Sequence, residues 1–215
     1  MVGRLIRLLI LALLANSVPA IAQPGTQRSR EVFGSLYASK WVDTSLPAFP
    51  VNLVTGDLRF RKPYFIAAGV NRVLVRDFGV AIPLTGIVLR KNSLELEGQL
   101  VKHFGGQDHV EATAAIVARS GEVGLFSGTS VNFAVANGLS YAFGRPDFEQ
   151  GPGGIRGQGS RHLQYHLGLE AEFSPSRASR LHLVAKLHHR SGIYGLISPR
   201  RTGSNFLGGG VRFDF

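Results

Sequence analysis

The chain has 215 residues and no cysteine, and its 24 Lys and Arg outnumber its 14 Asp and Glu, which gives a formal charge of +10. Because there is no cysteine, disulfide bonds are excluded as the means of holding the fold together. The basic charge suits an anionic partner, and the export signal described next favours lipid head groups and argues against nucleic acid.

The N-terminus has the features of a secretory signal peptide. Arg4 and Arg7 precede a short apolar run that ends at Leu14, and an Ala-x-Ala sequence lies directly before residue 23. This order of a basic region, an apolar region and a small-residue cleavage site is typical of secreted precursors. The alternative is a membrane anchor, but the run is shorter than the roughly 20 apolar residues that a membrane helix needs. We therefore expect cleavage after residues 1–22 and one mature domain over residues 23–215.

Apolar and polar residues alternate along most of the mature chain, which predicts β-strands with one apolar and one polar face. The pattern predicts eight strands, in chain order about 31–43, 58–76, 93–104, 109–119, 130–143, 162–173, 180–191 and 204–215. Segment 78–90 is apolar but contains Pro83 and Gly86. It could be a ninth strand, an extension of a neighbouring strand or a covering loop.

Strands of this length, with charges of both signs on their polar faces, fit a barrel that crosses a membrane and encloses a polar interior. The main alternative is a soluble β-sandwich, whose strands also alternate. We predict an all-β fold, an antiparallel transmembrane β-barrel of about eight strands. Both termini would then lie in the periplasm, which makes 44–57, 144–161 and 192–203 external loops.

The chain ends on an aromatic residue, with Val211, Phe213 and Phe215 on one strand face. This ending resembles the C-terminal signal that the barrel assembly machinery recognises in bacterial outer-membrane proteins. The resemblance implies a location in the outer membrane of a Gram-negative bacterium. It also implies that the barrel assembly machinery, through Phe215, and outer-membrane lipids are partners.

Several titratable residues fall on the predicted inner face. His103, His109 and Glu111 belong to one tight hairpin and could bind a metal ion such as zinc. The favoured interpretation is a charge network that fills the interior of a small barrel and includes Glu95, Glu97 and Arg119. We therefore predict no metal site, and a narrow pore is the least favoured function because eight strands leave little room.

Polar residues on the predicted lipid-facing side of the last hairpin are the strongest candidates for chemistry. His189 and Ser191 are two residues apart on one strand, so their side chains point the same way, about 6–7 Å apart. The imidazole could accept the hydroxyl proton. Asn205 on the next strand shares this face and could orient the imidazole. Polar side chains facing lipid are costly, which favours a functional role.

This His-x-Ser arrangement resembles the PagL-type lipid A 3-O-deacylases, which are described as acyloxyacyl-hydrolase-like eight-stranded barrels. The resemblance covers mainly residues 160–215. It implies that His189 is the general base and that Ser191 is the nucleophile. The family's acidic residue has no match, since 192–205 contains no Asp or Glu, and Asn205 is the nearest substitute.

We also expect three arginines that flank the site to bind the phosphates of the substrate, because a guanidinium can bind a phosphate with two hydrogen bonds. They are Arg190, Arg200 and Arg201. The predicted function is hydrolysis of an ester-linked acyl chain of lipid A, the anchor of lipopolysaccharide. No cofactor is expected, because acyl transfer by Ser and His needs none. The alternative is a non-catalytic small barrel with a structural or surface-binding role.

Overall fold

The structure is a computed structural model, and it describes residues 31–81, 85, 88–149, 161–176, 178–199 and 202–215. The predicted signal peptide, residues 1–22, lies outside the described residues. Among the described helices, none is long and apolar enough to cross a membrane.

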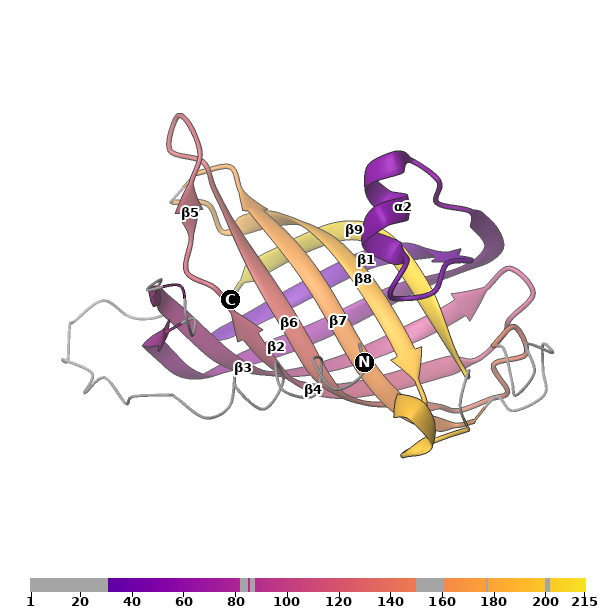
Figure 1. The fold of residues 1–215 in the computed structure, drawn as a ribbon. Helices are drawn as coiled ribbons and strands as arrows, with labels where there is room; N and C mark the ends of the chain where they lie inside the picture. Colours follow the sequence, from indigo (N-terminus) through magenta and orange to yellow (C-terminus); the bar gives the residue numbers. More distant parts are fainter. Residues whose placement is uncertain (1–30, 82–84, 86–87, 150–160, 177, 200–201) are drawn as a thin grey trace.

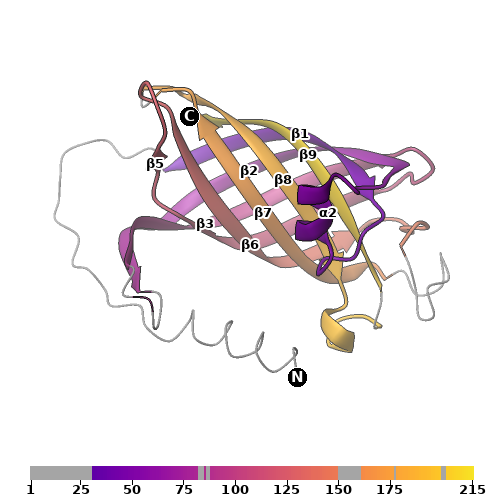
Figure 2. The same ribbon diagram turned by 45° about the horizontal axis from the view of Figure 1, so that its top comes forward.

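The alternating segments form eight long antiparallel strands that close into a ring (Figures 1 and 2). Closure comes from two pairings, the first strand with the last and β4 with β6. The strands are β1 (Val32–Val42), β2 (Phe60–Ala81), β3 (Val88–Phe104), β4 (Val110–Arg119), β6 (Ser130–Ala142), β7 (Leu163–Ser174), β8 (Leu181–Ser191) and β9 (Gly203–Asp214). The prediction of an eight-stranded barrel is confirmed.

Three elements depart from the predicted outline. In the predicted segment 78–90, residues 78–81 and 88–90 extend β2 and β3, because Val80 pairs with Leu89 beyond a series of register shifts. Pro83 and Gly86 lie outside the described residues. Within this extension the side-chain amide of Asn92 donates a hydrogen bond to the carbonyl of Phe78. This bond substitutes for a backbone hydrogen bond between the two strands where their register shifts. The second departure is a helix, α2 (Phe49–Thr55), inside the predicted loop 44–57. A short strand, β5 (Val123–Gly124), also pairs with β6.

The two faces of the wall have opposite chemistry. Large apolar side chains such as Leu36, Ile66 and Leu100 are exposed on the outside, and Leu100 is 64% exposed. Charged side chains point inward and are buried, as Glu95 and Glu111 illustrate. A soluble protein would bury the first set and expose the second. The outer face therefore belongs in lipid, as in outer-membrane barrels.

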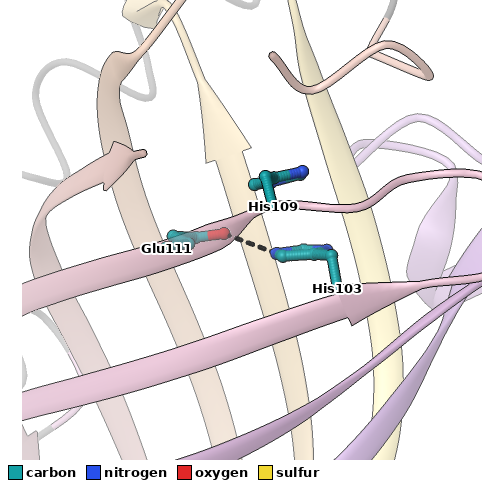
Figure 3. A group of neighbouring side chains, drawn as sticks. All are labelled: His103, His109 and Glu111. Atoms are coloured by element: carbon teal, nitrogen blue, oxygen red, sulfur yellow. Dashed lines mark hydrogen bonds and ion pairs between the residues drawn. The ribbon is translucent and has the colours of Figure 1, made fainter. Parts of the chain in front are cut away.

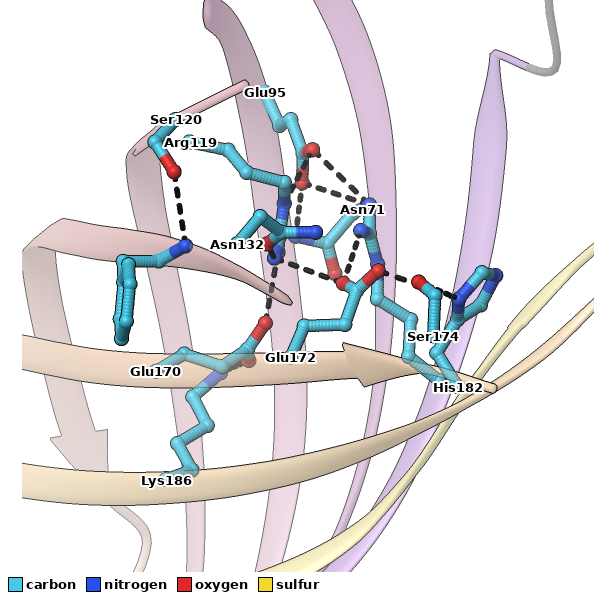
Figure 4. Close-up of polar contacts among 12 residues, drawn as sticks. Asn71, Glu95, Arg119, Ser120, Asn132, Glu170, Glu172, Ser174, His182 and Lys186 are labelled. Carbon is cyan, nitrogen blue, oxygen red and sulfur yellow. Dashed lines mark hydrogen bonds and ion pairs between the residues drawn. The ribbon is translucent and has the colours of Figure 1, made fainter. Parts of the chain in front are cut away.

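Ion pairs fill the interior near the periplasmic end (Figure 4). Arg119 is bonded to three carboxylates, Glu95, Glu170 and Glu172, at 2.8–2.9 Å. Nearby, Lys186 is paired with Glu97 at 2.8 Å. Each of these six buried charges therefore has a partner of opposite sign, as burial in a low-dielectric interior requires. The predicted charge network is confirmed for Glu95, Glu97 and Arg119.

The external half of the interior is closed by aromatic rings and by a loop. Tyr37, Trp41, Phe65 and Phe206 form one buried cluster, and Phe148 of the β6–β7 loop packs against it.

Where β1 pairs with β9, a glycine allows the two strands to approach closely, because a Cβ atom at Gly208 would overlap the carbonyl of Ala38 in the adjoining strand. Close approach of backbone is the usual reason for glycine inside a strand.

Candidate active site

Helix α2 and its flanking loops lie against the outside of the barrel, at the external end of β1, β8 and β9 (Figures 1 and 2). A second apolar cluster holds them there, with Val42, Phe49 and Leu187 buried at its centre. Pro50 occupies the first turn of the helix, where its missing N–H is not needed, and Gly56 ends the helix at φ 79°. The outer face of the last hairpin is thus partly covered by protein.

His189 and Asn205 meet under this cover. The two residues are paired across β8 and β9, and the imidazole Nδ1 lies 2.6 Å from the Asn205 Oδ1. The Asn205 Nδ2 donates to the backbone carbonyl of Thr44, in the loop before α2. This bond fixes which end of the amide faces the histidine. Because Oδ1 can only accept, the Nδ1 atom of the neutral imidazole must carry the hydrogen. The lone pair is then on Nε2, which is the arrangement of a general base.

Ser191 shares the outward face with His189 and lies at the last position of β8. Its backbone is opposite Tyr165 on one side and Gly203 on the other, and its side chain is partly exposed. No hydrogen bond joins Ser191 to His189 among the residues that the structure describes. Contacts of this kind often shorten only when the substrate binds.

The backbone is strained two and three residues after Ser191. Ile193 and Tyr194 have φ angles of 43° and 53°, a left-handed conformation that β-branched and bulky residues rarely adopt. The strained residues belong to the 3-10 turn η2 (Ile193–Gly195). Strain of this kind is concentrated at functional sites, where the surrounding structure holds the backbone in place.

The prediction that Arg190 binds substrate is wrong. Its side chain points to the interior, where it is 1% exposed and is bonded to Glu149 and Ser140. The physical reason is the period of a strand, since a residue between two outward residues must face inward. The other two predicted phosphate ligands, Arg200 and Arg201, lie outside the described residues.

Two features near the site had no signal in the sequence. The first is the carbonyl of Thr44, because a backbone atom of a loop leaves no residue pattern. The second is a polar pocket of about 480 Å³ in the same loop. One of its lining residues is Thr44, whose carbonyl accepts the hydrogen bond from Asn205. Its lining residues are Asp43, Thr44, Ser45, Ala48, Asn52, Asp57 and Arg59.

Comparison with known proteins supports the fold. Neither a protein-family model nor a curated protein matches the sequence. Among solved structures, the outer membrane enzyme PagL is similar, with a TM-score of 0.55 and 10% identity over 85% of this chain and 99% of that chain. Neisserial surface protein A has a TM-score of 0.44 and 14% identity over 87% and 98% of the two chains. The chain therefore has the eight-stranded outer-membrane barrel fold, in agreement with the predicted location in the outer membrane.

Proposed function

We propose that this protein is an ester hydrolase of the outer membrane that removes an ester-linked acyl chain from lipid A. The observation that carries the proposal is the 2.6 Å contact between the His189 Nδ1 and the Asn205 Oδ1 on the outward face. This contact holds the imidazole with Nδ1 toward Asn205. The proposal requires that Nε2 reach the hydroxyl of Ser191, which lies two residues along the same strand face.

In the proposed reaction the Ser191 hydroxyl attacks the acyl carbonyl, and His189 Nε2 takes the hydroxyl proton. The same proton then passes to the leaving sugar oxygen as the carbon–oxygen ester bond breaks. Water, activated by His189, releases the fatty acid and restores the serine. Asn205 holds the ring in position, but as a neutral amide it stabilises the imidazolium less than a carboxylate would.

The surroundings of the site suit a lipid substrate. Helix α2 exposes Val51, Leu53 and Val54, and the last of these is 87% exposed. Tyr194 and Leu196, after the serine, are also exposed. An apolar helix at the external end of the barrel wall is at the depth of the outer leaflet, where acyl chains meet head groups. The polar pocket beside Thr44 provides space for a sugar head group.

The test is the mass of lipid A from cells that express the full chain. We expect loss of one hydroxyacyl chain with the wild-type protein and no loss with Ser191→Ala or His189→Ala. His162→Ala is the matched control, because His162 is an exposed histidine at the external end of the barrel. Unchanged lipid A in the presence of folded wild-type barrel would refute the proposal.

A non-catalytic barrel is the second candidate, and one contact favours it. Because Asn205 is bonded both to His189 and to the Thr44 carbonyl, these residues could serve only to fasten the α2 segment to the wall. In that case Asn205→Ala would free the segment for proteolysis and lipid A would stay intact with every variant.

A further inference from the structure

Four buried histidines surround one buried glutamate inside the external half of the barrel. They are contributed by β3, β7, β8 and the residue before β4. Glu111 is central, because its Oε2 is 2.9 Å from His103 Nε2 and its Oε1 is 2.9 Å from His188 Nε2. The rings of His103 and His109 stack at 4.2 Å, and those of His166 and His188 lie 4.4 Å apart.

The glutamate satisfies only part of this cluster. Both ring nitrogens of His109, both of His166 and the Nδ1 of His103 are buried, and no hydrogen-bond partner for them occurs among the described residues. The rings are nearly inaccessible, with His109 3% and His166 0% exposed. Buried polar atoms normally have partners, so five unpartnered imidazole nitrogens in one place need an explanation.

Although the sequence favoured an interior charge network over a metal site at these residues, we propose that His103, His109 and Glu111 form a binding site for a zinc-like divalent cation. One ligand atom from each of the three residues lies within 4.8 Å of the others (Figure 3). A tetrahedral zinc ion with bonds of about 2.0–2.2 Å separates its ligand atoms by roughly 3.4 Å. The stacked rings of His103 and His109 must therefore rotate apart when the ion binds, and the fourth ligand position is left to a further group. The two imidazole nitrogens favour zinc over the hard cations calcium and magnesium, and a carboxylate oxygen is also a common zinc ligand.

The neighbouring groups support a bound cation. His188 is bonded to the other oxygen of Glu111, which is how outer-shell partners orient a metal-binding carboxylate. Arg190 lies 3.8 Å from the same oxygen, but its positive charge is compensated by the buried Glu149. Ser140 also donates to this Oε1, so the oxygen that the proposal gives to the metal is Oε2, which is bonded to His103.

This site lies on the inner side of the wall, whereas the proposed catalytic residues face outward. It is therefore independent of ester hydrolysis. A metal bridge between β3 and the start of β4 would tie the two ends of the external turn 105–109 together. Its expected consequence is a folded state that zinc stabilises by mass action.

The test uses untagged barrel isolated from outer membranes of cells that express the full chain, stripped with a chelator and dialysed against Zn²⁺. We expect one zinc ion per folded barrel. Loss of an outer-shell partner alone lowers metal affinity roughly 10–100-fold, so His109→Gln and Glu111→Gln should each lower it more than about tenfold. The matched control is His182→Gln, because His182 is also a buried interior histidine but is bonded to Ser174 near the periplasmic end.

Gel mobility of the unheated protein reports whether each variant is folded. A wild-type barrel that keeps no zinc would overturn the proposal, as would equal affinity in His109→Gln or an equal loss in His182→Gln. If the ligand variants fail to fold, X-ray absorption of the zinc-loaded wild type decides. Imidazole scattering from two histidines would support the site, and oxygen scattering alone would overturn it.

Discussion

Removal of Arg119 should destabilise the barrel strongly, because this side chain connects three buried carboxylates. It lies 2.9 Å from Glu95, 2.8 Å from Glu170 and 2.9 Å from Glu172, and it is 6% exposed. The substitution Arg119→Met keeps most of the volume and removes the charge. The three carboxylates then keep their negative charge with less compensation inside the barrel (Figure 4).

Neighbouring cations limit the size of the effect. Arg212 remains bonded to Glu95 and Glu172 at 3.0 and 2.8 Å, and Lys186 remains 3.5 Å from Glu170. No carboxylate is therefore left fully unpaired, and we expect the cost of one broken buried pair, about 3–5 kcal/mol. With a urea dependence of about 2 kcal/mol/M, the unfolding midpoint would fall by about 1.5–2.5 M.

The assay is reversible urea unfolding in lipid vesicles, followed by the fluorescence of Trp41, the chain's single tryptophan, which is buried. Arg61→Met is the matched control, because Arg61 loses the same charge from an exposed pair with Asp43. Exposed pairs contribute about 0–1 kcal/mol. If the urea midpoints of Arg119→Met and Arg61→Met agree within about 0.5 M, the buried ion pairs of Arg119 stabilise the barrel no more than an exposed ion pair does, and the prediction is refuted.

Three further predictions concern the wall, the helix and pH. Gly208→Ala should lower the free energy of unfolding by about 1–3 kcal/mol through overpacking. The control Gly98→Ala, where a Cβ atom meets open space, should change it by no more than about 0.5 kcal/mol. Equal folded fractions of the two variants on unheated gels would contradict this prediction. Phe49→Ala should release helix α2, accelerate its proteolysis and reduce ester hydrolysis while the barrel stays folded. Val54→Ala, which removes an exposed side chain, should leave the helix attached and its proteolysis unchanged. With a chelator present, the free energy of unfolding should fall as the pH drops from about 6.5 toward 3. The reason is that burial above all lowers the pKa of His109 from 6.5 to about 3, so in this range only the unfolded chain binds a proton at this residue. His109→Gln should show a smaller fall, and a pH profile identical to that of the wild type would show that His109 does not cause it.

Residue alternation is a local property, and for that reason the sequence determined the strands and their two faces. Leu100 faces outward and Glu95 inward because alternate residues of a strand point to opposite faces. The same rule places His189, Ser191 and Asn205 on one face. The same parity rule, applied to Arg190, would have shown that its side chain is internal. The extension of β2 and β3 was harder to predict, because Pro83 and Gly86 interrupt the pattern.

Contacts between residues distant in sequence were decided only by the tertiary structure. The Asn205 amide is oriented by the carbonyl of Thr44, 161 positions away, and helix α2 is held by Leu187 through barrel closure. The histidines that meet at Glu111 come from separate strands, so no spacing rule could show that several of their nitrogens are unpartnered. A strand pattern specifies which way a side chain points, but ring closure and register specify which side chains it meets.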